Sequence, residues 1–395
     1  MEQLLKQAKN IQRKIAQIRR ELHVNAETGF AIPKTLAIVE RELKKLGIQP
    51  IPCGKAGIVA VLGDEEKERV VLLRADMDGL PMYEATGEKY ACKTGNMHAC
   101  GHDMHTAMLL GAARLLKARE QELQGSVKLL FQPAEEILKG ASDVIKAGVL
   151  EDPTPQAALT LHVSTGTNLS AGNFVFSTRE ISAPAADYFK IEVKGKSAHG
   201  STPDQGVDAL LIAAYILLSL QTLPAREQSL DKPFVLTAGK MQGGTAGNAI
   251  ADSAIIEGTV RCYDEDTRAR LKKRIAEIAL SQAKAFKGRA KTTFEGGCPT
   301  LKNDRALSEF ICACAEELFG KKRVTKTDGR GGGSEDFAYI SQKLPSALVV
   351  LGAGEKSKGY AYPLHHPKTR FDERVLYKGS ALMAYFAQEW LKKSP

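Results

Sequence analysis

Apolar runs of strand length alternate with stretches of helical periodicity through the first 165 residues of the chain. The apolar runs are 57–63, 69–76, 126–132 and 157–163, and the helical stretches are 105–123 and 135–150. Runs that are apolar almost without interruption are typical of strands covered on both faces, as in a sheet with parallel strands and helices on either side. The pattern therefore predicts an α/β fold whose sheet is parallel at least in part.

The pattern of the sequence changes near residue 183. Residues 187–195 alternate between apolar and polar, as in a strand with one solvated face, and the segments run strand, helix, strand, strand, helix, strand. That order resembles a ferredoxin-like α+β module. Because 395 residues exceed what one hydrophobic core usually covers, we expect two domains. One is formed by residues 1–182 and 295–395, and the other is inserted at 183–294.

Composition and charge exclude several classes of protein. No apolar run approaches the roughly 18 residues of a membrane helix, so we expect no membrane partner. The 7 cysteines lack the spacing of a disulfide framework and indicate free thiols in a cytoplasmic protein. The net charge of +9 is spread among acidic residues. We therefore expect no nucleic-acid partner, and the mild positive charge suits a small anionic substrate.

Polar residues stand where the predicted strands end and where the helical stretch at 105–123 begins. They are Asp76, Asp78, Glu135, Glu136 and His162 after strands, and Cys100, His102 and Asp103 before the helix. In open α/β sheets this edge binds ligands. Thiolate, imidazole and carboxylate together suit zinc and similar ions better than magnesium or calcium. The sequence therefore predicts a metal site, and the surplus of carboxylates favours two ions.

Each of these features has an ordinary explanation when it is taken alone. A lone histidine such as His162 is more often a hydrogen-bonded structural residue, and the pair Glu135–Glu136 can simply complement a helix dipole. Their gathering at one sheet edge is what favours a metal site. The glycine-rich segment 328–337 is compatible both with a flexible loop and with a backbone that lines a substrate pocket.

Nine sequence blocks occur in the order found in one enzyme family. They are LRADMDGLP, HACGHDMH, FQPAEE, a strand-end histidine, GKSAHGSTPDQGVDAL, GGTAGNAI, EGTVR, SEDF and LHHP. By these blocks the chain resembles the aminoacylase–hippurate hydrolase family of metal-dependent amidohydrolases, which includes bacterial N-acyl-amino-acid hydrolases and plant auxin-conjugate hydrolases. The resemblance implies a zinc-peptidase-like α/β catalytic domain with a mixed sheet. It also implies that the inserted ferredoxin-like domain is a lid, which can mediate a homodimer.

The resemblance implies roles for individual residues. Two divalent ions, Zn²⁺ or Mn²⁺ with Co²⁺ or Ni²⁺ as alternatives, would be bound by Cys100, His102, Glu136, His162 and His365. Glu135 would be the general base, and Asp78 would orient the neighbouring histidine. His199 of the insert would stabilise the tetrahedral oxyanion, from its own subunit or from the partner. Asn248 and Arg261 stand where the family contacts the carboxylate of the substrate.

The chain departs from the family pattern in four places. HVNAETGF, around Glu27, replaces His-x-x-Pro-Glu-Leu-Gly-Phe, and NAIADSA replaces Asn-Val-Ile-Pro-Asp. RGGGSEDF is richer in glycine than usual, which suggests a roomier or more mobile wall. LHHP has two histidines where the family has one. By alignment His365 is the ligand and His366 takes a Ser/Asn position, although the sequence leaves either ring available to a metal.

The expected reaction is hydrolysis of the amide bond of an N-acyl amino acid, hippurate-like or N-acetylated, to a carboxylate and a free amino acid. The alternative is a dipeptidase or aminopeptidase, which would need an acidic group such as Glu335 to receive a free α-amine. A non-catalytic metal-binding protein is disfavoured, because such a site has no use for the spare base Glu135.

Overall fold

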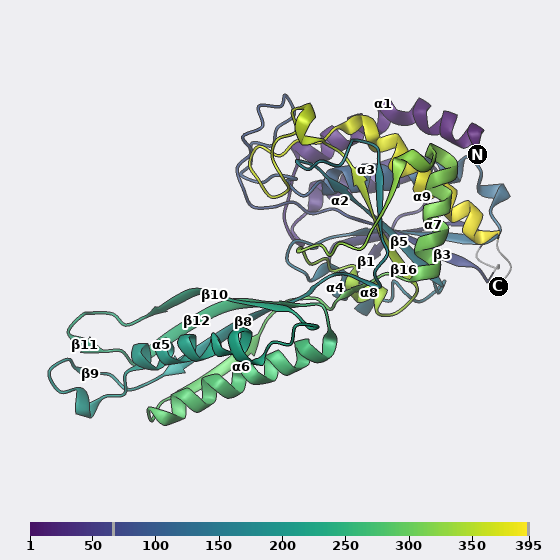
Figure 1. Ribbon diagram of the computed structural model, residues 1–395. Coiled ribbons are helices and arrows are strands. Elements are labelled where there is room, and N and C mark those ends of the chain that lie inside the picture. The colour runs from purple at the N-terminus through teal and green to yellow at the C-terminus, as the bar shows by residue number, and fades with distance from the viewer. Residues whose placement is uncertain (65–67, 393–395) are drawn as a thin grey trace. The chain divides into compact units, whose positions relative to one another are not determined.

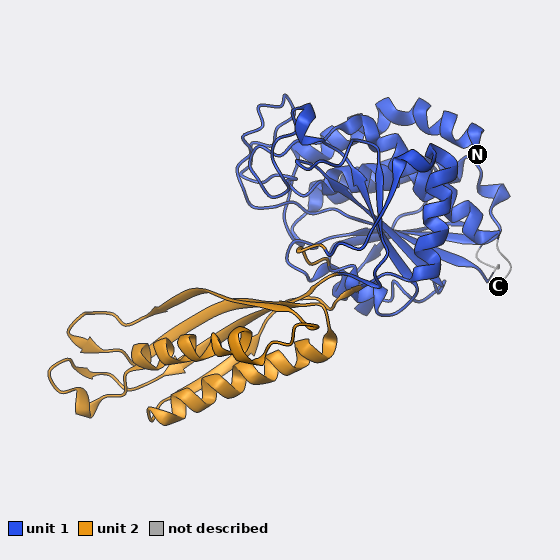
Figure 2. Cartoon of the chain, in the orientation of Figure 1, with its two compact units in different colours: residues 1–182, 302–330, 336–395 blue, residues 183–301, 331–335 orange. Residues whose placement is uncertain are grey.

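The computed structural model of the protein describes residues 1–64 and 68–392. The chain divides into two compact units (Figure 2). Unit 1 comprises Met1–Ser182, Lys302–Arg330 and Asp336–Pro395, and unit 2 comprises Ala183–Leu301 and Gly331–Glu335. The chain first leaves unit 1 within strand β7 (Ile181–Ala183) and returns within strand β14 (Leu301–Lys302).

Unit 1 is built on an eight-stranded sheet with the strand order β1-β2-β4-β3-β5-β16-β6-β15. Within the series β4-β3-β5-β16, neighbouring strands are parallel. The pairs β1–β2, β2–β4 and β16–β6 are antiparallel. The sheet is therefore mixed, and the predicted α/β fold class is confirmed. The strands are β1 (Ile51–Cys53), β2 (Gly57–Gly63), β3 (Val70–Asp76), β4 (Ser126–Gln132), β5 (Ala157–Ser164), β6 (Phe174–Ser177), β15 (Val324–Thr327) and β16 (Ser346–Gly352).

Helices α1, α3 and α9 pack against one another, and α3 and α9 also contact the sheet (Figure 1). Every residue of β3 and β4 is buried, which requires cover on both faces of the sheet. Helix α3 is almost completely buried, so the histidine-rich turn at its start lies inside the protein. The helices of unit 1 are α1 (Glu2–Val24), α2 (Pro33–Lys44), α3 (His102–Lys117), α4 (Gly140–Lys146), α7 (Arg305–Phe319), α8 (Ala338–Ser341) and α9 (Leu376–Leu391).

Unit 2 is an antiparallel four-stranded sheet with two helices packed in its core. The sheet order is β10-β12-β8-β13, which is the order 2-3-1-4 of a ferredoxin-like module. Two short strands, β9 and β11, form a separate pair. The elements are β8 (Ala185–Lys194), β9 (Ala198–His199), α5 (Ala209–Leu220), β10 (Phe234–Gly243), β11 (Ala249–Ile250), β12 (Ser253–Cys262), α6 (Glu265–Ala285) and β13 (Arg289–Phe294).

Helix α5 begins the most apolar stretch of the described chain. Residues Ala209–Glu227 are long and apolar enough to cross a membrane by length and composition, which corrects the expectation that no run approaches that length. Ile212, Ala213 and Ile216 are nevertheless completely buried in the core of unit 2. The stretch therefore packs as a domain helix that is apolar on both faces, with one face on the sheet and the opposite face exposed.

Candidate metal centre and active site

The predicted site residues of unit 1 come from the ends of neighbouring strands. Strands β4, β3 and β5 are adjacent and parallel, so their carboxyl ends lie at one edge of the sheet. Asp76 is the last residue of β3, Glu135 and Glu136 follow β4, and His162 lies near the end of β5. His102 opens α3, which packs on β3 and β5. The topology thus brings these side chains together.

The five predicted ligands form two overlapping groups that share one thiol. Ligand atoms of Cys100, His102 and His162 all lie within 4.8 Å of one another, and so do those of Cys100, Glu136 and His365. Cys100 Sγ is 3.5 Å from His162 Nε2. His365 Nε2 is 3.6 Å from Glu136 Oε2. We call these five side chains the ligand edge, and two groups with a shared sulfur are an arrangement suited to two adjacent ions.

Buried atoms without partners show that the ligand edge fits a metal. In the described part of the chain, both ring nitrogens of His102 and Oε1 of Glu136 are buried and make no hydrogen bond. The carboxylate oxygens of Asp78 and Asp76 lie 3.6 and 3.7 Å from the two ring nitrogens, beyond hydrogen-bond length. Buried polar atoms are costly unless something satisfies them. A bound cation would satisfy the Glu136 oxygen and one ring nitrogen of His102, and the other ring nitrogen would carry the proton beside an aspartate.

The electrostatics of the ligand edge also favour a cation. Burial lowers the pKa of His162 to about 3, which leaves the neutral imidazole that binds metals. Its Nδ1 donates to the carbonyl of Val163 at 2.8 Å, so Nε2 is the nitrogen that faces Cys100. Burial raises the pKa of Cys100 and of Glu136. A cation would reverse that penalty, because it stabilises the thiolate and the carboxylate.

Asp78 and Asp76 have different partners behind the ligand edge. Asp78 accepts the backbone N–H groups of Glu135 and Glu136 at 2.9 and 3.2 Å, so it holds the segment that carries the expected base. Asp76 accepts from Nδ1 of His105 at 2.6 Å, and Nε2 of His105 accepts the N–H of Val163 at 2.8 Å. His105 therefore bridges β3 and β5, a role that the sequence analysis did not assign.

Backbone strain concentrates around the same side chains. Four described residues other than glycine have positive φ, and three of them are Ala134, Leu138 and His365. Ala134 and Leu138 flank Glu135 and Glu136, and His365 is itself a candidate ligand. Strained backbone of this kind persists where the surroundings hold it, and it is typical of functional sites.

Asp336 of the SEDF block anchors the end of the glycine-rich segment. Its carboxylate is completely buried and accepts from Arg74 Nη2 at 3.0 Å, Gln132 Nε2 at 2.7 Å and the N–H of Ala141 at 2.8 Å. Its own N–H donates to Oε1 of Glu135 at 3.3 Å. This end of the segment is therefore fixed beside the expected base, whereas the preceding glycines at 331–333 are exposed.

A buried ion-pair network ties α1 to the start of α3. Oδ2 of Asp103 lies 2.6 Å from Arg19 Nε and 2.7 Å from His23 Nδ1, and Nε2 of His23 lies 3.0 Å from Glu84. Burial alone would raise the pKa of Asp103, but the charges of Arg19 and His23 hold it far below its ordinary value. Because Asp103 directly follows His102, the network fixes the helix turn that carries this ligand.

The departure from the family pattern around Glu27 has a clear structure. The Glu27 carboxylate accepts the backbone N–H groups of Lys34 and Thr35, both at 3.0 Å, at the start of α2. Its carbonyl accepts the N–H of Gly79 at 2.7 Å, next to Asp78. Glu27 thus caps a helix and supports the loop that follows β3.

The three site residues expected in unit 2 do not lie together. Strand β9, which ends at His199, pairs with β11, and the carbonyl of Asn248 accepts the N–H of Gly200 at 2.8 Å. His199 and Asn248 are therefore neighbours, in what we call the β9–β11 end. Arg261 pairs with Ala186 near the start of β8, whereas β9 follows the other end of β8. Eight residues along β8 span roughly 26 Å.

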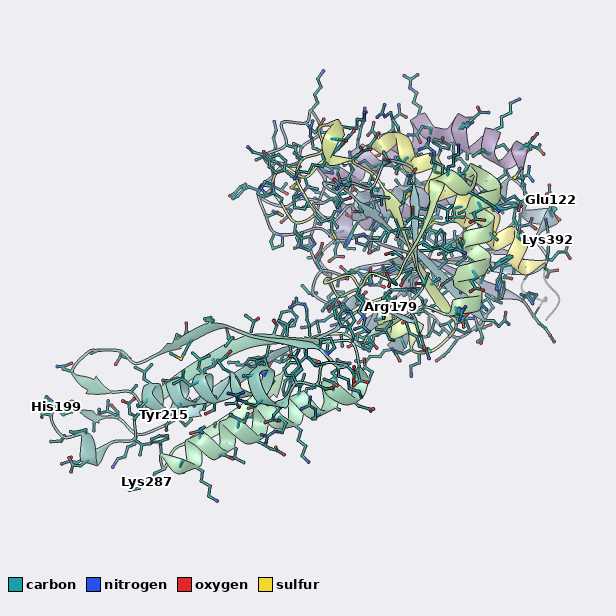
Figure 3. The ribbon with its side chains drawn as sticks, viewed as in Figure 1. Glu122, Arg179, His199, Tyr215, Lys287 and Lys392 are labelled. Atoms are coloured by element: carbon teal, nitrogen blue, oxygen red, sulfur yellow. The ribbon has the colours of Figure 1, made fainter. Side chains whose placement is uncertain are left out.

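His199 is exposed and lies near one extremity of unit 2 (Figure 3). Its Nδ1 accepts the backbone N–H of Ser201 at 3.1 Å and lies 2.8 Å from the Ser201 hydroxyl. A neutral imidazole that accepts at Nδ1 carries its proton on Nε2. His199 is therefore a solvent-accessible hydrogen-bond donor, the form that the oxyanion role requires.

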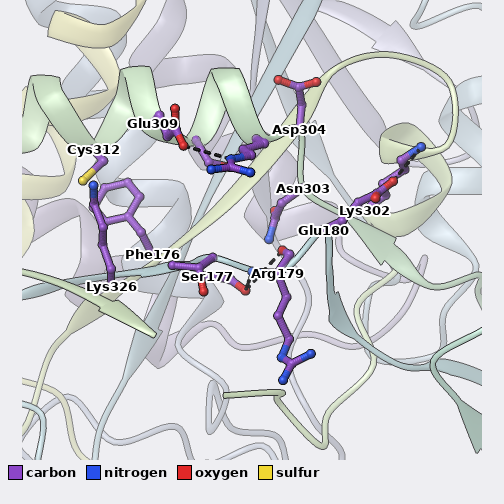
Figure 4. Close-up of a pocket in the computed structure, with 13 residues that line it drawn as sticks. Phe176, Ser177, Arg179, Glu180, Lys302, Asn303, Asp304, Glu309, Cys312 and Lys326 are labelled. Carbon is purple, nitrogen blue, oxygen red and sulfur yellow. Dashed lines mark hydrogen bonds and ion pairs between the residues drawn. The ribbon is translucent and has the colours of Figure 1, made fainter. Parts of the chain in front are cut away.

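A cavity of about 580 Å³ in unit 1 lies apart from this chemistry (Figure 4). Its lining includes Arg179, Lys302 and Arg305 but none of the expected ligands. The basic groups are already engaged, since Lys302 pairs with Glu180 and Arg305 with Glu309, both at 3.0 Å. We therefore do not assign the reaction to this cavity.

Comparisons with known proteins agree with the predicted fold and with the family resemblance. A family model described as peptidase family M20/M25/M40 matches residues 72–389. The chain is 36% identical over 385 residues to the N-acetyl-L-cysteine deacetylase of Bacillus subtilis (strain 168), covering 97% of this chain and 88% of the relative. It is 37% identical over 380 residues to the IAA-amino acid hydrolase ILR1-like 4 of Arabidopsis thaliana, covering 95% and 85%.

A solved structure from Bacillus subtilis gives the same result in three dimensions. It is described as a dinuclear metal-binding peptidase from the M20 family, and it matches with a TM-score of 0.80 and 30% identity over 98% of this chain and 100% of that chain. These likenesses confirm the family resemblance that the nine sequence blocks indicated.

Proposed function

Because the chain belongs to the peptidase family M20/M25/M40, we propose that it is a metal-dependent amidohydrolase that cleaves N-acyl amino acids to a carboxylate and a free amino acid. One observation carries the proposal: an oxygen of Glu135, which is not one of the five ligands, lies within 4.8 Å of ligand atoms of His102 and Glu136. A carboxylate that lies beside the metal without serving as one of its ligands is what deprotonation of water requires. The names of the deacetylase and of the IAA-amino acid hydrolase support this substrate class.

The residues of the chain divide the work of the reaction. Divalent ions at the ligand edge would polarise the amide carbonyl and acidify a bound water. Glu135 accepts the proton of the attacking water and delivers it to the departing amine. Asp78 and Asp336 hold Glu135 in place through the backbone hydrogen bonds described above. Nε2–H of His199 donates to the tetrahedral oxyanion.

The donor set supports zinc or manganese as the resident ions. A thiolate and three imidazoles favour Zn²⁺, and the carboxylates extend the range to Mn²⁺, with Co²⁺ and Ni²⁺ able to take the same ligands. All seven cysteines are free thiols, which supports a reducing, cytoplasmic setting.

We assign the lid and dimerisation roles to unit 2, and propose a homodimer. Arg261 lies toward one end of the four-stranded sheet, and Asn248 lies beyond its other end, next to the separate β9–β11 pair. Within one chain they are too far apart to contact the carboxylate of a single substrate. If both serve one substrate, they come from two copies of the chain. The exposed apolar face of α5 offers a surface for the second copy. It carries Leu210, Leu211, Tyr215 and Leu218.

The substrate proposal is tested by matched substrates. N-acetyl and N-benzoyl amino acids are compared with their carboxamides and with dipeptides that have a free amine. A guanidinium binds a carboxylate through two hydrogen bonds. Loss of the carboxylate should therefore lower kcat/KM roughly 30- to 1000-fold, which corresponds to about 2–4 kcal/mol of transition-state stabilisation. Equal rates on acid and carboxamide would contradict the carboxylate contact. A preference for free-amine dipeptides would move the protein to the peptidase class.

A further inference from the structure

The candidate ligand His365 lies in a turn, residues 363–369, that is held by contacts within unit 1. Leu364 packs against the main core. The carbonyl of Pro367 accepts the N–H of Ala85 at 2.7 Å. The N–H of His365 donates to the carbonyl of Ala99 at 3.1 Å, directly before the ligand Cys100. The turn therefore connects two of the candidate ligands through backbone.

His365 adopts a backbone conformation that it would not choose by itself. Its φ is 60°, in the left-handed region that histidine seldom occupies. Its side chain is 53% exposed, so side-chain packing alone cannot hold the ring in position. The contacts of the turn must therefore supply the restraint.

Thr369 closes this turn from both sides of His365. Its side chain is 1% exposed. The hydroxyl donates to the carbonyl of Pro363 and accepts the N–H of His366 at 3.2 Å. The backbone N–H of Thr369 donates to the carbonyl of His366 at 2.9 Å. One buried hydroxyl thus joins the residue two before His365 to the residue directly after it.

The second histidine of LHHP is used to build the turn. Nδ1 of His366 accepts the N–H of Lys368 at 3.1 Å. Its ring stacks on Tyr362 with centroids 4.4 Å apart and an interplanar angle of 16°. In the described part of the chain His366 belongs to none of the candidate metal groups, whereas His365 does. The turn thereby selects which of the two rings faces Glu136.

We infer that Thr369 is a positioning residue whose buried hydroxyl holds His365 in its metal-binding conformation. The inference rests on the proposed metal site. It predicts that the hydroxyl contributes to metal affinity, because partners behind a ligand commonly change affinity by about 10- to 100-fold. The hydroxyl acts through His365, because its hydrogen bonds are to backbone groups of Pro363 and His366.

The test compares Thr369→Val, which keeps the shape but removes the hydroxyl, with Thr369→Ser, which keeps the hydroxyl. The matched control is Thr35→Val, because Thr35 is also buried and its hydroxyl donates to Glu27 at 3.1 Å, on α2. Zn²⁺ affinity is measured by chelator competition, and Co²⁺ absorption spectra report the coordination geometry. Kinetics at saturating metal give KM and kcat.

We expect Thr369→Val to weaken the less tightly held ion by about 10- to 100-fold and to alter the Co²⁺ spectrum. Thr369→Ser and Thr35→Val should stay within about threefold of the wild type, as expected of variants that spare the hydrogen bonds of the turn. Wild-type affinity in a folded Thr369→Val protein would overturn the inference. Thr369→Ala, which adds no bulk, serves if Thr369→Val does not fold.

Two further experiments distinguish the role of Thr369 from the proposed metal site on which it rests. His366→Ala should keep the metal, because both hydrogen bonds between His366 and Thr369 are made by backbone atoms of His366. Loss of metal in that variant would overturn the assignment of the turn. A wild-type protein that binds no divalent ion would overturn the proposed metal site itself. Normal metal binding with an indifferent Thr369→Val overturns only the role of Thr369.

Discussion

The ligand edge of unit 1 and the β9–β11 end of unit 2 both carry residues assigned to one reaction, but they are built differently. Cys100 and His102 are buried, and burial lowers the pKa of the nearby His162 to about 3. Three strained residues lie in the segments that bear the ligands and the base. His199 and Asn248, by contrast, are exposed, and the hydrogen bonds described above for them are made within the β9–β11 end.

The difference separates two kinds of function. A buried, strained group of ligands is organised before anything binds, and its unsatisfied atoms are satisfied by a cation. An exposed donor on a short strand pair adds nothing to metal binding and acts only when a substrate is present. Substitutions at the ligand edge should therefore change metal content, whereas substitutions at the β9–β11 end should change kcat or KM and leave the metal content unchanged.

The largest effect should come from the two adjacent glutamates. Glu135→Gln keeps the size of the side chain but cannot accept a proton, so kcat should fall by about 10²- to 10⁴-fold with the metal content unchanged. Glu136→Gln should lose metal, because it removes a charged ligand. Steady-state kinetics and elemental analysis of both variants check this. Loss of metal in Glu135→Gln but not in Glu136→Gln would show that the two roles are exchanged.

A somewhat smaller effect is expected at the β9–β11 end. His199→Ala should lower kcat by about 10²- to 10³-fold, as loss of one oxyanion donor does, with full metal occupancy. Mixing this variant with Glu135→Gln sharpens the comparison. If His199 acts in the partner subunit, mixed dimers regain part of the wild-type activity. Normal turnover of His199→Ala alone would reduce the residue to a structural role.

The smallest effect concerns the network behind the ligand edge. Burial and Arg19 oppose protonation of His23, but Asp103 and Glu84 outweigh them and raise its pKa. A raised pKa contributes fully to the free energy of unfolding below about pH 6.5, and this contribution is lost as pH rises through the folded-state pKa. In the presence of chelator, the free energy of unfolding of the wild type should exceed that of His23→Gln by about 1.5–3 kcal/mol at pH 6. This difference in free energy of unfolding should be smaller at pH 9. Urea unfolding that gives the same difference at pH 6 and pH 9 would contradict the role assigned to His23.

The sequence predicted that polar side chains gather at one edge of the sheet, because the order of strands along the chain determines which strand ends lie together. Parallel neighbours such as β3, β4 and β5 end at one edge, so residues that follow strands meet without any knowledge of distances. The ferredoxin-like order of unit 2 followed from alternation of apolar and polar residues in the same way. Both predictions rest on periodicities that the backbone imposes.

Other features could not be read from the sequence. The bridge made by His105 depends on Asp76, which is 29 residues away, and Asp336 reaches Arg74 across 262 residues. Nothing in local spacing specifies such pairs. A family resemblance assigned Asn248 and Arg261 to one carboxylate but carries no distances, so their separation within unit 2 appears only in the structure. The left-handed φ of His365 had no signal in a histidine.

The central claim is that Cys100, His102, Glu136, His162 and His365 together bind divalent metal. The most direct measurement is metal stoichiometry: the protein is stripped with chelator, titrated with Zn²⁺ or Mn²⁺, and analysed for bound metal and activity, with Cys100→Ala in parallel. We expect two ions per chain, activity that returns with them, and a parallel loss of both in Cys100→Ala. A protein that binds no metal and keeps its activity in chelator would contradict it.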